Sequence, residues 1–273
     1  MGRRRRPPWK VEATITTSPV LLTERRGAVL LLTLNRPQVG NAYNDELRFT
    51  FLATLREAEQ DNEIRAAVVT GTGKHFCSGA DLSGEAGLTA EGYRANAQRY
   101  DWIYEVQRMP VPVIAAIEGY AAGAGMALAM ACDVRVMAED SHLFPAFTQR
   151  GLAPDSGVAW ALTNIVGPGQ AMQWLLDAHR IPAVEALEAR LTQHLVPAGQ
   201  ALTRALEIAE GWARGPSIAF ALAKRQVWAS LNTTLPEALR FEQDSRFLTH
   251  QTHDRIEGRT AFQEKRPPKF LGR

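Results

Sequence analysis

The sequence predicts an α/β fold in which a largely parallel sheet, covered by helices on both faces, is followed by a helical C-terminal region. Through about residue 165, continuous apolar runs of strand length alternate with amphipathic helical patterns, which is typical of parallel strands buried on both faces. Beyond that point we expect helices only. The 273 residues can bury a large core, and 45% of them are hydrophobic.

Four apolar runs in the first half of the chain predict buried strands, and they span 28–35, 65–73, 111–119 and 133–139. A helix is expected over 44–60, where Asn44 or Asp45 could cap the first turn. A second helix is expected over 90–109, where Pro110 stops the pattern. A short helix should follow the glycine-rich loop that starts at Gly119.

Five further helical patterns follow in the second half of the chain, and they span 170–180, 183–191, 201–215, 217–231 and 235–248. We therefore divide the chain into a basic, disordered tail over 1–19, an α/β core over 20–200 and a C-terminal helical region over 201–273. The tail carries four successive arginines and Lys10 beside two prolines, a composition typical of a solvated segment.

Composition argues against several classes of partner. A formal net charge of only +2 does not favour nucleic-acid binding, and no run of 18 uncharged apolar residues predicts a membrane helix. Cys77 and Cys132 lie in apolar surroundings and are expected to be buried, reduced thiols, which favours a cytoplasmic location. The six histidines show no metal-ligand spacing, so no metal site is expected.

The loop "GYAAGAG" (119–125) and the segment "GTGKHFCSGADL" (71–82) both follow predicted strands. The first lacks the dinucleotide pattern G-x-G-x-x-G, and neither is a P-loop. Each could present a backbone N–H, and two such donors would make an oxyanion hole. Spacing alone favours another interpretation of the glycines, namely close packing that tolerates only small residues.

Asp155 stands in "GLAPDSG" (151–157), a turn that opens a helical run. Spacing alone favours an aspartate that caps this helix. The alternative is a carboxylate that acts as a general base, which would need a partly apolar site to raise its proton affinity.

Taken together these segments resemble the crotonase family, also called the enoyl-CoA hydratase/isomerase superfamily. The resemblance covers about residues 20–271 in order and spacing, and it rests on 32–47, 71–82, 109–147, 151–162 and 258–270. It implies a core of repeated ββα units, C-terminal helices that form a homotrimer or a hexamer, and an acyl-CoA substrate. Coenzyme A would be part of that substrate, so no separate cofactor is expected.

The resemblance assigns roles to individual residues. The backbone N–H groups of Ala80 and Ala124 would be the oxyanion donors, although the family usually has glycine at the second position. Ser78 and Leu82 would line the CoA groove. Phe262 and Lys265 would reach CoA from a neighbouring subunit, unless Lys265 is merely a solvated helix end.

Some residues of this chain differ from the family pattern, and these differences indicate which of the family's reactions to expect. Hydratases of the family use two glutamates, and the matching residues here are Ala127 and Phe147, so we do not expect hydration as the main reaction. Asp155 matches the working aspartate of family isomerases and dehalogenases, and the sequence is most similar to the epoxyphenylacetyl-CoA isomerase group. The resemblance therefore implies an acyl-CoA isomerase in which Asp155 removes and returns a proton.

Three alternatives remain at this point. Asp155 could be a nucleophile, as in an aryl-CoA dehalogenase. The chain could be a hydratase in name only, or it could bind acyl-CoA without turnover. The acyl pocket is expected to take its shape from Trp102, Tyr104, Phe144, Phe147 and Trp160.

Overall fold

The structure is a computed structural model that describes residues 18–84 and 101–273. Its centre is a six-stranded sheet in the order β1-β2-β3-β4-β6-β9. The strands are β1 (Leu21–Arg26), β2 (Val29–Leu34), β3 (Ala66–Gly71), β4 (Val113–Ile117), β6 (Val134–Ala138) and β9 (His194–Val196). β1 pairs antiparallel with β2, and the other pairs in this sheet are parallel. The four strands expected from the sequence are therefore confirmed as β2, β3, β4 and β6.

A second sheet of three short strands joins β5 (Tyr120–Ala122), β7 (His142–Phe144) and β8 (Ile181–Pro182). The sequence does not predict this sheet. Two strands, β8 and β9, also lie beyond residue 165, so the expectation of helices only in that part is wrong. Strands of two or three residues are too short to show an alternating pattern, which explains why they were missed.

Successive residues of the main sheet point to opposite faces, as strand geometry requires. Leu30, Leu32 and Val69 lie in one buried cluster, whereas Leu31 and Val68 lie in another. The first cluster includes side chains of α1 (Asp45–Glu59), α3 (Asp101–Arg108) and α4 (Ala124–Ala131). The second packs against α7 (Ala201–Ala213). The sheet is thus covered on both faces, as predicted.

Helix α1 begins where the sequence predicts, because the Asn44 side chain caps it by accepting a hydrogen bond from Leu47 N at 3.0 Å. Most of the helix expected over 90–109 lies outside the described residues, apart from α3. Helix α5 (Val158–Leu176) contains a kink at Gly167 followed by Pro168, and α6 (Ala183–Glu188) follows it.

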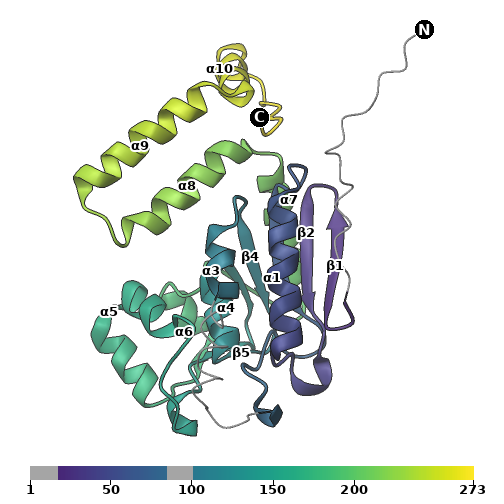
Figure 1. Cartoon of the computed structure of the whole chain (residues 1–273), viewed down its shortest axis with the longest axis vertical. Helices are drawn as coiled ribbons and strands as arrows, with labels where there is room; N and C mark the ends of the chain where they lie inside the picture. Colours follow the sequence, from purple (N-terminus) through teal and green to yellow (C-terminus); the bar gives the residue numbers. More distant parts are fainter. Residues whose placement is uncertain (1–17, 85–100) are drawn as a thin grey trace.

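The last helices are α8 (Ser217–Ser230), α9 (Leu235–His250) and α10 (His253–Glu264). Figure 1 shows α9 and α10 beyond one end of the main sheet, far from β5. Helix α10 was not among the predicted helices. The division at residue 200 remains a prediction, and α7, on its C-terminal side, packs on the sheet.

No helix within 18–84 and 101–273 has the length and apolar character needed to cross a membrane.

Candidate active site

Two loops that leave the ends of β3 and β4 lie side by side and carry the predicted donors. Cys77 N donates to Tyr120 O at 3.1 Å, and Ala122 N donates to Cys77 O at 2.8 Å. A Cβ atom added to Gly79 would lie 3.8 Å from Ala124 N. Since Gly79 directly precedes Ala80, the structure brings the Ala80 and Ala124 segments together, which the sequence could not show.

The amide N–H groups of Ala80 and Ala124 are both available to bind an anion. Within the described part of the chain, no acceptor is bonded to the N–H of Ala80 or of Ala124. Ala124 is the first residue of α4, where the helix leaves its amides unpaired and its dipole favours negative charge. Its φ is not among the positive values, so alanine fits this position as well as glycine would.

The glycines of 119–125 also serve close packing, so the second interpretation of this loop holds too. Gly123, with φ +52°, has a backbone conformation that favours glycine. A Cβ on Gly125 would collide with Cys77 O and lie 2.7 Å from Cys77 Cβ. The small residues therefore allow the β4 loop to approach the β3 loop closely enough to bring the Ala80 and Ala124 segments together.

Replacing Gly125 by alanine is therefore expected to destabilise the fold by about 2 kcal/mol, the cost of overpacking a tight contact. Urea unfolding would measure it. Gly211→Ala in α7 is the matched control, because an added Cβ there meets nothing within 4 Å and φ is not positive. That control should be neutral or stabilise by about 0.5–1 kcal/mol. Equal effects of the two substitutions would contradict the packing role of Gly125.

Asp81 anchors the Ala80 segment, a role that the sequence analysis missed. Its carboxylate accepts from Arg36 Nη2 at 2.7 Å and from Ser83 Oγ at 2.6 Å. The bonds from Ser83 and Arg36 lower the pKa of Asp81 to about 2. Asp81 N also donates to Tyr43 O at 2.9 Å. This aspartate is thus a fixed anion that holds the loop and is not suited to proton transfer.

Asp155 does not cap helix α5, so the capping interpretation is wrong. The N-cap is Gly157, which makes no side-chain cap bond. Ser156 and Gly157 have φ of +54° and +84°, and these two left-handed residues turn the chain into the helix before the Asp155 carboxylate can reach its first amides. The carboxylate instead accepts from Ser156 Oγ at 2.9 Å.

Ser156 is a second residue whose role the sequence does not reveal. It is buried, with 7% of its surface exposed, and it adopts a conformation uncommon for residues other than glycine. Its hydroxyl occupies one carboxylate oxygen of Asp155. The other oxygen has no hydrogen-bond or ion-pair partner among residues 18–84 and 101–273.

The wall beside the two amides is apolar. Phe147 Cζ lies 3.9 Å from the position of a Cβ on Gly123, and Phe147 and Ala127 are 6% and 2% exposed. Cys77 is also close, but burial raises the pKa of its thiol to about 11, so it is not a thiolate nucleophile. Burial likewise raises the pKa of Cys132 to about 12, and both cysteines are free and buried, as predicted.

The predicted CoA-contacting residues form two groups that one chain does not bring together. Ser78 lies on the β3 loop, where its hydroxyl donates to Val39 O at 2.9 Å, and Leu82 is exposed in η2 (Leu82–Gly84). Phe262 is 86% exposed on α10, and Lys265 ends that helix. Figure 1 shows α10 at the opposite end of the molecule from β5.

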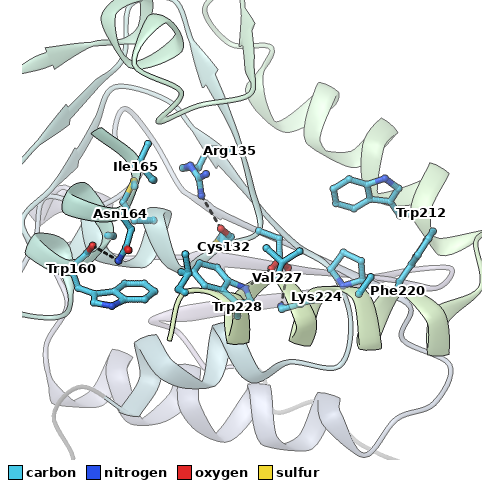
Figure 2. Close-up of a pocket in the computed structure, with 16 residues that line it drawn as sticks. Cys132, Arg135, Trp160, Asn164, Ile165, Trp212, Phe220, Lys224, Val227 and Trp228 are labelled. Carbon is cyan, nitrogen blue, oxygen red and sulfur yellow. Dashed lines mark hydrogen bonds and ion pairs between the residues drawn. The ribbon is translucent and has the colours of Figure 1, made fainter. Parts of the chain in front are cut away.

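A cavity of about 440 Å³ lies at the far end of α4 from Ala124, between the core and α8. Figure 2 shows Trp160 and Trp228 there, with ring centroids 6.1 Å apart. Lys224 and Asp133 form a 2.8 Å ion pair in its wall. Trp160 therefore lines this cavity at the end of α4 that is remote from Ala124.

In the described part of the chain, no group of three or more histidine, cysteine, aspartate or glutamate side chains is placed to hold a metal ion.

Comparison with known proteins places this arrangement in a family. The family model described as enoyl-CoA hydratase/isomerase matches residues 24–273. The chain is 40% identical over 247 residues to a Rhodobacter capsulatus protein named "Probable enoyl-CoA hydratase", covering 89% of this chain and 94% of the relative. It is 31% identical to the 1,2-epoxyphenylacetyl-CoA isomerase of Escherichia coli, covering 93% and 98%.

A solved structure shows the same fold. The enoyl-CoA hydratase of Bacillus anthracis superposes with a TM-score of 0.88 at 33% identity, covering 93% of this chain and 100% of that one. The chain therefore belongs to the enoyl-CoA hydratase/isomerase family, the crotonase family. It is an enzyme of that superfamily, and the α/β fold with C-terminal helices expected from the sequence is confirmed.

Proposed function

We propose that this enzyme is an acyl-CoA isomerase in which Asp155 is the proton carrier and the Ala80 and Ala124 amides form the oxyanion hole. The observation that supports it most is the distribution of acid groups. Asp81 is held by Arg36 and Ser83, whereas Asp155 keeps one carboxylate oxygen unpartnered within the described residues. Ala127 and Phe147 stand where hydratases have their glutamates, and neither can carry a proton.

The position of Asp155 along the chain also supports this role. Leu152 N donates to Phe147 O at 3.2 Å, so the segment before Asp155 is tied to the residue that walls the hole. Val158, three residues after Asp155, is fully buried in the cluster that contains Ala124 and Phe147. The segment before Asp155 is thus bonded to the Phe147 segment, and the segment after it enters the same buried core.

The proposed reaction on a β,γ-enoyl-CoA conserves all atoms. Asp155 takes a proton from the carbon next to the thioester carbonyl, the electron pair of that C–H bond forms a double bond to the carbonyl carbon, and the carbonyl π pair moves onto the oxygen. The two amides stabilise the resulting enolate, each by about 2.7–4 kcal/mol. The Asp155 carboxylic acid then returns the proton to the γ carbon, which places the double bond in conjugation. No oxidant, reductant or additional cofactor is needed.

An aryl epoxide is the second substrate class that the proposal includes. The same amides would polarise the thioester of an epoxyphenylacetyl-CoA, and that polarisation would drive ring expansion. The identity of 31% to an epoxyphenylacetyl-CoA isomerase supports testing this class.

Hydration is the second candidate, since several relatives carry hydratase names. Mass spectrometry separates the two reactions on one panel of β,γ-enoyl-CoA, α,β-enoyl-CoA and epoxyphenylacetyl-CoA. Isomerisation gives products of unchanged mass, whereas hydration adds one water. We expect unchanged mass with a new retention time. Water addition as the faster reaction would overturn the proposal.

The remaining proposed contacts require more than one chain. In a homotrimer or a hexamer, Ser78 and Leu82 of one chain would bind a CoA molecule. Phe262 and Lys265 of a neighbouring chain would contact the same CoA molecule. Large apolar side chains exposed on α8 to α10 support such assembly, among them Val227, Leu235, Leu239, Phe247 and Ile256. Sedimentation should give three or six times the chain mass, and a monomer would contradict it.

A further inference from the structure

His75 lies in the short ladder that joins the two donor loops. Backbone bonds make up most of this ladder, including Phe76 N to Glu118 O at 2.9 Å. One side chain takes part as well: His75 Nδ1 accepts a hydrogen bond from Tyr120 N at 3.3 Å. His75 stands five residues before Ala80, and Tyr120 stands four residues before Ala124, so this bond links the two donor segments directly.

The rings around this bond extend the link to a third segment. The rings of His75 and Tyr120 have centroids 5.2 Å apart, and those of Tyr120 and His142 are 5.4 Å apart. Tyr120 and His142 are register partners in β5 and β7. β7 continues into Phe147, the apolar wall of the hole. The three rings therefore tie together the segments that carry Ala80, Ala124 and Phe147.

Close packing leaves this link little room to move. A Cβ on Gly119, where φ is +56°, would lie 2.5 Å from His75 Nδ1 and would collide with Lys74 O. The backbone at Gly119 therefore lies directly against the imidazole, and a displacement of the imidazole would be transmitted to the β4 loop.

We propose that His75 is a positioning residue for the oxyanion hole, and that its neutral imidazole keeps the two donor loops in register. To accept from Tyr120 N, Nδ1 must be unprotonated, so the ring carries its proton on Nε2. A second proton would place an N–H on Nδ1 facing the N–H of Tyr120. The bond would then be replaced by repulsion, which would shift the β4 loop relative to the β3 loop within the ladder. This inference rests on the proposed function, because the hole is part of it.

Burial and one neighbouring charge favour the neutral form of His75. Lys74 is the neighbour on its own segment, the Tyr120 ring lies against it from the β4 loop, and His142 lies on the other side of Tyr120. The Glu118 carboxylate accepts from Gly199 N and Ala201 N, both at 3.0 Å, and is thus engaged elsewhere. Burial, and then the charge of Lys74, lower the pKa of His75 below its usual 6.5.

The sign of the pH effect follows from this lowered pKa. Near neutral pH the imidazole is uncharged and the bond to Tyr120 is intact. As the pH falls below 6.5 and passes through the lower pKa of the folded protein, His75 gains a proton and the bond is lost. We therefore expect kcat to fall on the acid side more than KM changes, because the hole stabilises charge that develops only in the enolate.

Two substitutions separate this role from a merely structural one. Asparagine places its Oδ1 near the position of Nδ1 and accepts at every pH, whereas leucine cannot accept. His75→Leu is expected to lower kcat about 10-fold, less than the loss of a whole donor. His75→Asn should restore most of that turnover at pH 8 and should lack the loss of kcat below pH 6.5 that the unmodified enzyme shows.

A second readout does not depend on turnover. Infrared spectroscopy of bound 13C=O-labelled phenylacetyl-CoA reports the strength of the hole through the carbonyl stretch. We expect a low-frequency shift at pH 8 that shrinks at pH 5 in the unmodified enzyme, stays constant in His75→Asn and is small in His75→Leu. Circular dichroism checks folding. If His75→Leu does not fold, the comparison of the unmodified enzyme with His75→Asn decides alone.

The outcomes distinguish this inference from the proposed function. The unmodified enzyme could isomerise β,γ-enoyl-CoA while His75→Asn shows the same dependence of kcat on pH and the same carbonyl shift. That result would overturn the role of His75 alone. A pH-dependent carbonyl shift without any isomerisation would overturn the proposed function and support His75.

Discussion

Asp155→Asn is expected to lower kcat for double-bond isomerisation by about 10³-fold, within the usual contribution of a general base. Asparagine keeps the size of the side chain and can still accept the hydrogen bond that Ser156 Oγ makes to Asp155 at 2.9 Å. The amide cannot take a proton from carbon. Steady-state kinetics with a β,γ-enoyl-CoA would measure the loss.

The matched control is Asp177→Asn at the other end of the same helix, where the side chain is exposed. It should leave kcat and the affinity for CoA thioesters unchanged. Unaltered turnover in folded Asp155→Asn would remove Asp155 from the mechanism. If turnover falls but 18O from labelled water enters the Asp155 carboxylate of the unmodified enzyme, Asp155 is a nucleophile instead of a base.

Ala124→Pro is expected to lower kcat by about 10²–10³-fold, the loss measured when one oxyanion donor is removed from other enzymes. Ala124 is the first residue of α4, the position at which a helix best tolerates proline because the amide has no helical partner. The substitution therefore removes the N–H with little cost to the helix. Thermal unfolding would confirm that the fold persists.

Ala124→Gly is the control for this prediction, since glycine keeps the N–H. It should retain kcat within about threefold, because the N–H stays and the change only removes one buried methyl group and adds conformational freedom. If Ala124→Pro folds and turns over as fast as Ala124→Gly, the Ala124 amide does not hold the oxyanion.

The sequence predicted the strands that are long and apolar and the helix with both an apolar face and a cap. β2, β3, β4 and β6 are apolar runs of five or six residues, and α1 shows both its apolar face and its Asn44 cap. It did not predict β1, an edge strand in which only the first residue is buried. It also did not predict β5, β7, β8 or β9, because strands of two or three residues carry too few positions for a pattern. Their partners come from distant segments, which a local pattern cannot indicate.

The candidate site was predicted only in part, because its segments are distant in the sequence. Resemblance supplied Ala80, Ala124 and Asp155, while spacing alone favoured packing for the glycines and a cap for Asp155. The structure shows that Gly125 packs on Cys77 and that this packing brings the two donor loops together. The prediction that Asp155 caps the helix is wrong because Ser156 and Gly157 both have left-handed backbone conformations. A serine in the sequence does not predict that conformation.

His75 illustrates what sequence could not provide. Its ring has no metal-ligand spacing, so the pattern gave it no role. Its partner is the backbone N–H of Tyr120, 45 residues away, and no side-chain type marks that donor. The Asp81 anchor is similar, since Arg36 precedes it by 45 residues.

Hydrogen exchange at the carbon next to the thioester tests the central claim most directly, because it reports proton removal alone. Phenylacetyl-CoA has no double bond to move in its acyl chain, so incubation with the enzyme in D₂O can only exchange its acidic hydrogens. We predict deuterium incorporation by the unmodified enzyme, read by mass spectrometry, and a rate about 10³-fold lower in Asp155→Asn. Bound thioester that gains no deuterium, or equal rates in the two proteins, would contradict the account.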